Sequence, residues 1–160
     1  VVAVAIVVWQ YINTPPPPAT PWEGYLRAVT TLQDTGDRKL AARQFSDVER
    51  LFPDSEYTAE SRELCKLLQQ MIAEDKAWKE PHDPDSLPLA ERIEYHIHHI
   101  RDVNCYQMSQ PGACHVLFNF DDGYNAAVEL RKIGDPAVPH LIALLDDRRP
   151  IRSVGYWRNF

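Results

Sequence analysis

Apolar residues recur three or four positions apart along most of the chain, and this spacing predicts six amphipathic helices. The first helix begins with Thr20 as its N-cap residue, Pro21 in the first helical position and Glu23 completing a capping box. Its apolar face is predicted to consist of Trp22, Tyr25, Leu26, Val29 and Leu32. A Gly-Asp pair at 36–37 then separates this helix from the next one.

Two further helices are predicted to follow without a long break. One face of the second helix carries Leu40, Ala41, Phe45, Val48 and Phe52. Pro53 ends this helix, because proline cannot continue the helical hydrogen-bond pattern. A third helix is predicted over about 55–78 from an inward stripe of Leu64, Leu67, Leu68, Met71 and Ile72. Cys65 borders that stripe and is expected to pack as a small apolar residue.

A linker and a fourth helix come next. Residues 80–88 combine prolines with acidic residues and predict a linker between two helical regions. The fourth helix begins near Leu89, and its buried stripe is predicted to contain Leu89, Ile93, Ile97, Ile100 and Val103. Residues 104–122 show little periodicity and contain a Pro-Gly turn at 111–112, so a loop is predicted there.

Two short helices complete the pattern. The first contains Ala126, Ala127, Leu130 and Ile133, and it stops at Gly134. Asp135 and Pro136 begin the second, which is expected to bury Val138, Leu141, Ile142, Leu144 and Leu145. Asp146 and Asp147 then end it. Together the six helices predict an all-α chain of antiparallel helical hairpins.

The N-terminal residues differ from the rest in being apolar throughout. Residues 1–8 contain only Val, Ala and Ile, and Trp9, Tyr11 and Ile12 follow, as at a membrane interface. Eight residues are fewer than the roughly 20 needed to span a bilayer, so residues 1–12 are interpreted as the end of a transmembrane anchor. The alternative is a buried β-strand, which we disfavour because no second strand-like run is recognised downstream.

The flank of this segment predicts its orientation. No Lys or Arg occurs before Arg27, whereas cytoplasmic flanks are rich in both. The folded part is therefore expected outside the cytoplasm, in a bacterial periplasm or at a cell surface. Residues 13–21 include Pro15 to Pro18 and Pro21, which predict a stiff polyproline spacer between anchor and helices.

The first helical pair resembles a tetratricopeptide repeat. Ala41, Phe45 and Pro53 have the spacing of the second helix of such a repeat. Tyr25, Ala28 and Leu32 lie at the positions where its first helix packs. Val29 departs from the pattern, where a small residue is usual. The sequence FPDSEY at 52–57 also resembles repeats of bacterial envelope proteins. The resemblance implies one repeat plus a capping helix over 22–79.

The last helical pair resembles a HEAT repeat of the subtype related to bacterial phycobilisome-lyase-like repeats, over about 123–155. The matching residues are Leu130, Ile133, Gly134, Asp135, Pro136, Ala137, Val138, Pro139, Leu141, Ile142, Leu144, Leu145, Asp146 and Arg152. Gly155 departs from the pattern, where an alanine usually begins the next repeat. The resemblance implies an α-solenoid-like arrangement in which Asp146 and Arg152 pair between neighbouring repeats. Because such units need neighbours, the HEAT-like region 89–160 is expected to be truncated at its C-terminal end.

Charge and composition exclude some functions. The chain has 160 residues, with 17 Lys and Arg against 23 Asp and Glu, and a net charge of −6 argues against a nucleic-acid binder. No glycine-rich phosphate-binding motif occurs. Ser109 and Ser153 lack the setting of a catalytic nucleophile, and the paired aspartates are explained as helix caps. We therefore expect no enzymatic activity and no cofactor.

The acidic segment 80–122 contains five of the six histidines and two cysteines. His96, His99, Cys105, Cys114 and His115 are the candidate ligands of a metal-binding or metal-sensing site. Helical spacing weakens this hypothesis, since no two of the histidines are four positions apart. We expect His96 to be packed and His98 to be solvated. Cys105 and Cys114 could form a disulfide across the Pro-Gly turn or remain buried free thiols.

Basic and aromatic residues gather after the last predicted helix, and they are the candidate binding surface: Arg148, Arg149, Arg152, Tyr156, Trp157 and Arg158. The alternative is that the arginines cap helices or meet Asp146 while Trp157 packs internally. The sequence thus predicts a membrane-anchored, extracytoplasmic helical-repeat scaffold that binds proteins. A metal-binding protein and the non-catalytic part of a larger enzyme that continues beyond Phe160 are the alternatives.

Overall fold

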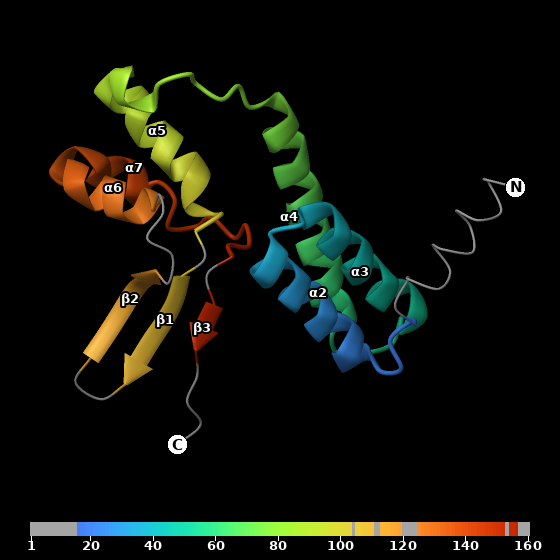
Figure 1. Cartoon of the computed structure of the whole chain (residues 1–160). Helices are drawn as coiled ribbons and strands as arrows, with labels where there is room; N and C mark the ends of the chain where they lie inside the picture. The colour runs from blue at the N-terminus through green and yellow to red at the C-terminus, as the bar shows by residue number, and fades with distance from the viewer. Residues whose placement is uncertain (1–15, 104, 111–112, 120–124, 153, 157–160) are drawn as a thin grey trace, which may run out of the picture.

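The computed structural model describes residues 16–103, 105–110, 113–119, 125–152 and 154–156, with the backbone alone in the last strand and between 105 and 119. The predicted anchor over 1–12 lies outside these residues. Figure 1 shows a helical bundle, a second helical unit joined to it by an extended segment, and a small sheet below that unit. Helices account for most of the described chain, as the all-α prediction expects, but the sheet departs from it.

The helical bundle contains α2 (Pro21–Thr35), α3 (Arg38–Leu51) and α4 (Thr58–Ala77), and α3 packs against both of its neighbours. The start of α2 is set locally: Thr20 Oγ1 accepts a hydrogen bond from the Glu23 N–H at 3.1 Å. Its end is set by Gly36, which adopts a left-handed conformation with φ of 68° and donates to Leu32 O. Both boundaries agree with the sequence prediction.

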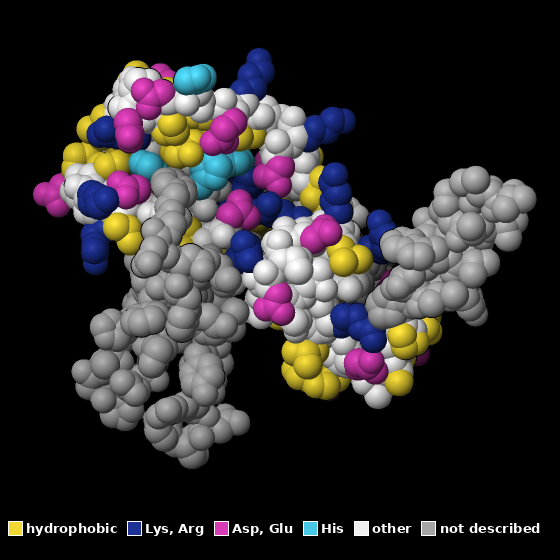
Figure 2. Space-filling model, viewed as in Figure 1, with side chains coloured by type: hydrophobic (Ala, Val, Ile, Leu, Met, Phe, Trp, Pro, Cys, Tyr) yellow, Lys and Arg dark blue, Asp and Glu magenta, His cyan; other side chains and the backbone are white. Residues whose placement is uncertain are grey.

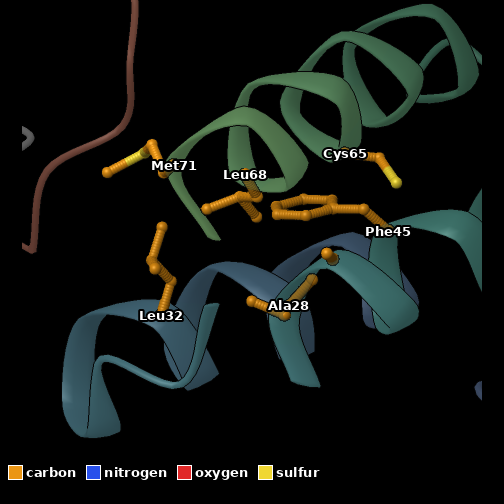
Figure 3. Close-up of a cluster of buried hydrophobic side chains, with 8 residues drawn as sticks. Ala28, Leu32, Phe45, Cys65, Leu68 and Met71 are labelled. Atoms are coloured by element: carbon orange, nitrogen blue, oxygen red, sulfur yellow. The ribbon is translucent and has the colours of Figure 1, made fainter. Parts of the chain in front are cut away.

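The bundle is held together by apolar side chains between its three helices. The buried cluster comprises Ala28, Leu32, Ala41, Ala42, Phe45, Cys65, Leu68 and Met71 (Figure 3). Cys65 packs in this cluster as predicted. Two members of the predicted face of α2 are exposed instead, Trp22 at 51% and Leu26 at 44%. Trp22 lies against the rings of Tyr25 and Tyr57 at the edge of the bundle rather than in its core.

The second helical unit contains α5 (Leu89–Ile100), α6 (Ala126–Ile133) and α7 (Val138–Ile142), with short 3-10 turns η1 (Pro84–Ser86) and η2 (Asp135–Ala137). Its core consists of Ile93, Leu130 and Ala137, with partly buried Ile97, Ile100, Ile133 and Leu141 around them. Leu89, predicted to lie in the buried stripe of α5, is exposed.

The outer side of α7 contradicts the predicted burial of its apolar residues. Val138, Ile142 and Leu145 are exposed by 46%, 60% and 80%. Ala137 and Leu141 make the inward contacts instead. The reason is geometric: one side of this short helix packs through Leu141 against the core of Ile93, Leu130 and Ala137, and no described segment covers the other side.

A three-stranded sheet occupies much of the segment predicted to be a loop. Its strands are β1 (Cys105–Gln110), β2 (Ala113–Asn119) and β3 (Val154–Tyr156), in the order β2-β1-β3. β1 and β2 are antiparallel and β3 is parallel to β1. The loop prediction was wrong because residues 105–110 and 113–119 form two strands that pair with each other. The statement that no strand-like run follows the N-terminal segment was wrong for the same reason.

No helix within the described ranges is both long enough and apolar enough to cross a bilayer.

Candidate functional site: the charged junction between the helical units

The two helical units meet at a cluster of oppositely charged side chains, which we call the charged junction. Its members are Arg38, Glu74, Asp75, Arg101, Asp102, Asp147 and Arg149. They come from the start of α3, the end of α4, the end of α5 and the segment after α7. In Figure 2 basic and acidic side chains gather between the two units.

Arg101 lies at the centre of the junction and is only 6% exposed. Its Nη1 donates to Glu74 Oε2 at 3.2 Å, and its Nη2 donates to Asp75 Oδ1 at 2.5 Å. Because Glu74 and Asp75 are adjacent at the end of α4, one guanidinium joins α5 to two carboxylates of the bundle. A buried arginine is costly to place unless it is paired, and these carboxylates meet that requirement.

Arg38 forms a second link across the same boundary. Its Nη1 donates to Asp75 Oδ2 at 3.1 Å, and its Nη2 is hydrogen-bonded to Asp102. Asp75 therefore accepts from arginines of both units, while Asp102 follows Arg101 directly in the chain. Each of the two arginines is thus paired with two carboxylates, which compensates its largely buried charge.

Arg149 links the segment after α7 to the bundle. Its Nη1 donates to Glu74 Oε2 at 2.7 Å, and its Nη2 donates to Asp147 Oδ2 at 2.5 Å. Burial opposes ionisation of Glu74, but hydrogen bonds from Gln70 and Arg149 and the nearby arginine charges outweigh it and lower the pKa of Glu74. The hydrogen bond from Arg149 likewise lowers the pKa of Asp147. Both carboxyl groups are therefore charged at neutral pH.

Arg152 contacts the bundle in a different way, through backbone atoms. Its Nε and Nη2 donate to the carbonyls of Gln33 and Asp34, at 3.1 and 2.9 Å. These carbonyls belong to the last turn of α2, where helical acceptors lack partners, so Arg152 caps that helix from the far end of the chain. The N–H of Arg152 also donates to Arg101 O at 3.0 Å.

We predict that replacing Arg152 by methionine lowers the free energy of unfolding by about 1–2 kcal/mol, because two carbonyls at the negative end of α2 lose charged donors. Urea titration followed by circular dichroism measures the change. The methionine variant of Arg148, whose side chain is exposed, provides the matched control. Equal stabilities of the two variants would show that the contacts of Arg152 are energetically neutral.

The structure changes the interpretation of the predicted binding residues. Arg149 and Arg152 contact their own chain, in agreement with the alternative that the arginines cap helices or pair with an aspartate. The partner of Arg149 is Asp147, however, and not Asp146. The Asp146–Arg152 pair implied by the HEAT resemblance does not occur among the described contacts. Arg148 is exposed. The side chain of Tyr156, and all of Trp157 and Arg158, lie outside the described part.

His98 lies against the junction rather than in solvent, which corrects the sequence prediction. Its ring stacks on Trp78, with 3.8 Å between ring centroids and an 8° interplanar angle. Arg101 Nη2 lies 2.9 Å from His98 Nε2. Burial and the charge of Arg101 lower the pKa of His98 from 6.5 to about 4. The imidazole is therefore neutral at physiological pH.

Acidification is predicted to destabilise the fold through His98. Because its folded pKa is depressed, the unfolded chain binds more protons between about pH 6.5 and 4. We expect a loss of about 1 kcal/mol between pH 7 and pH 5, allowing for the solvent that still reaches the ring. The His98→Phe variant, which can keep the stack on Trp78, should lose less over the same interval. The His82→Gln variant is an exposed control, and a wild-type loss equal to that of His98→Phe would contradict the assignment.

The other candidate metal ligands do not form a site in the described chain. His96 is buried and its pKa is lowered by burial, and His99 Nε2 lies 3.3 Å from Glu80 Oε2. Within the described residues no three His, Cys, Asp or Glu side chains are grouped to hold a metal ion. The side chains of Cys105, Cys114 and His115 lie outside the described part, so their contribution stays a prediction.

The strand register bears on the predicted disulfide. Cys105 is opposite Asn119 and Cys114 is opposite Ser109. Four residues along β1 therefore separate the two cysteine positions, about 13 Å at strand spacing. A disulfide needs Cα atoms within about 7 Å, so the bond is incompatible with this register.

Comparison with protein families, with curated proteins and with solved structures finds no match for the chain. The tetratricopeptide and HEAT resemblances therefore rest on the residues that suggested them.

Sequence reasoning missed five members of the charged junction: Arg38, Glu74, Asp75, Arg101 and Asp102. Each looks like an ordinary polar position on an amphipathic helix. The available signal was weak: Arg101 and Asp102 are charged residues at the end of a helix, directly before buried Val103.

Proposed function

We propose that the protein is a non-enzymatic helical scaffold that binds another protein through the outer side of α7. A tetratricopeptide-like bundle and a HEAT-like unit form the scaffold, and the N-terminal segment anchors it to a membrane outside the cytoplasm. The observation that carries the proposal is the exposure of Val138, Ile142 and Leu145, which we call the α7 stripe.

The α7 stripe has the geometry of a helix-packing surface. Its residues are spaced i, i+4 and i+7, so they fall on one side of the helix and the turns that extend it. Apolar side chains that are about half exposed or more gain free energy when a partner covers them. The chemistry that fits is an amphipathic helix of the partner, packed as α5 packs on the inner side of α7.

The charged junction supports a scaffold role because it holds the segment that follows the α7 stripe. Arg149 and Arg152 hold the segment after α7 to α2 and α4. A surface whose following segment is held in place loses less conformational freedom on binding than a free one. Arg148, exposed three residues beyond Leu145, adds a positive charge to the rim and favours a partner helix with an acidic flank.

Site-specific photo-crosslinking tests the binding proposal. A photoreactive amino acid in place of Ile142 or Leu145 is expected to give one discrete adduct with another protein, and the same residue in place of exposed Arg131 is expected to give none. The partner identified by mass spectrometry is then purified and titrated against wild type and Ile142→Arg. Loss of affinity in the variant supports the α7 stripe, whereas adducts independent of position would contradict it.

Fractionation tests the membrane proposal separately. The natural full-length protein is expected to stay in the membrane pellet after alkaline extraction. Its release into the supernatant would contradict an anchor over 1–12 and leave the binding proposal unaffected.

A further inference from the structure

The proline-rich segment before α2 lies against the bundle instead of extending away from it. Arg27 Nη1 donates to Pro16 O at 2.7 Å. A polyproline segment makes no internal hydrogen bonds, so its carbonyls are free to accept from a neighbouring donor. Arg27 is well placed for this role because Glu23, one turn earlier on α2, accepts from its other guanidinium nitrogen at 2.9 Å.

Gly24 makes the close approach of the prolines possible. It is buried, and a Cβ added to it would come within 3.1 Å of Pro18 Cγ and 2.9 Å of Val48 Cγ2. Any larger residue at this position would therefore push Pro18 away or displace Val48 of α3. The absence of a side chain lets a proline ring rest directly on the helix backbone.

The prolines form one wall of a groove of about 170 Å³ between the segment and α3. The other walls are lined by Leu40, Leu51, Arg27, Arg43, Gln44, Asp47 and Arg50. Leu40 and Leu51 supply partly exposed aliphatic surface, and the arginines supply N–H donors at its edge. The groove therefore offers aliphatic surface and arginine donors directly beside the docked prolines, where an extended proline-rich segment can add contacts.

We propose that the surface of α2 and α3 beneath Pro16–Pro18, formed by Gly24, Arg27 and Val48, is a recognition site for extended proline-rich segments. Pro16–Pro18 is its resident occupant in cis, and the groove lies directly beside it. The proposal is independent of the α7 stripe, because it concerns another surface and another ligand. The predicted spacer is thus a docked strap that fixes where the chain leaves the bundle. A proline-rich peptide in trans has to compete with it.

The docked segment is expected to weaken the binding of a free peptide by a defined factor. A segment tethered by a few residues has an effective concentration of about 1 mM, so a free peptide with an intrinsic Kd of about 0.1 mM binds about tenfold more weakly while the strap is in place. Removal of the resident prolines is expected to restore the intrinsic affinity.

Nuclear Overhauser spectroscopy of the full chain tests the cis contact. Cross-peaks are expected from the Pro18 ring protons to the Gly24 α protons and to a Val48 methyl group. They should weaken strongly in Arg27→Met and persist in Glu23→Gln, which breaks the ion pair of Arg27 but leaves its bond to Pro16. Absence of these cross-peaks in the wild type would overturn the docked strap.

A titration tests recognition in trans. The probe is a peptide with the sequence of residues 14–20, TPPPPAT, and the control peptide has its prolines replaced by alanine. We expect the full chain carrying Pro16→Ser, Pro17→Ser and Pro18→Ser to bind the probe about tenfold more tightly than the wild type does. Addition of Arg27→Met should remove that gain. Equal binding of probe and control, or no binding to the serine variant with its helicity intact, would overturn the proposal.

Discussion

Replacement of Arg101 by methionine is expected to lower the free energy of unfolding by about 2–3 kcal/mol. Methionine keeps much of the packing of the arginine stem but removes the donors to Glu74 and Asp75. Breaking one partner of a buried pair leaves the other charge poorly compensated. Because both carboxylates are about one third exposed, the expected loss lies at the low end for buried pairs. Urea denaturation followed by circular dichroism measures it.

The control for this experiment is Arg148→Met, which removes the same charge from an exposed position in the segment after α7. It should change stability by no more than about 0.5 kcal/mol. A loss of stability in Arg101→Met that is no larger than in the control would mean that the junction contributes nothing to the fold.

Replacement of Phe45 by alanine is expected to cost about 3–5 kcal/mol and to disrupt the bundle. Phe45 is 1% exposed and points from α3 toward Leu68 of α4 (Figure 3). Its ring also lies edge-on to Tyr25 of α2, with 5.6 Å between centroids. Loss of the ring leaves a cavity that touches all three helices. Thermal and urea denaturation of the variant measure the effect.

Leu26→Ala is the matched control for Phe45→Ala, because Leu26 is on α2 but 44% exposed. Its expected cost is below about 1 kcal/mol. A similar cost for both substitutions would mean that the bundle core is not centred on Phe45.

Local chemistry explains why the sequence predicted the helices well. The capping residues Thr20 and Asp37 and the stop at Gly36 act within one turn of the chain, so their effect can be read without knowledge of the fold. Apolar spacing identified Phe45, Leu68, Ile93 and Leu130 as core residues in the same way, and all four are buried.

The sheet was missed because its pairing depends on residues far apart. β1 ends at Gln110 and β2 begins at Ala113, so this pair could have been recognised locally as two strand-forming runs that lie two residues apart. β3 pairs with β1 across α6 and α7, and nothing in its three residues indicates that partner.

The charged junction was missed for a related reason. Glu74 and Arg149 are 75 residues apart, and Arg152 and Gln33 are 119 residues apart. Spacing rules describe neighbours on one helix and contain no information on such pairs. The predicted burial of the α7 stripe failed because helical periodicity shows which face is apolar, whereas a neighbouring element decides whether that face is covered.

The charged junction joins the bundle and the second helical unit into one frame. The most direct test is a distance measurement between spin labels attached in place of exposed Lys66 on α4 and Arg131 on α6, by double electron–electron resonance. We expect one narrow distance distribution in the otherwise wild-type chain and a broad one when Arg101→Met is added. A broad distribution in both chains, or an equally narrow one in both, would contradict it.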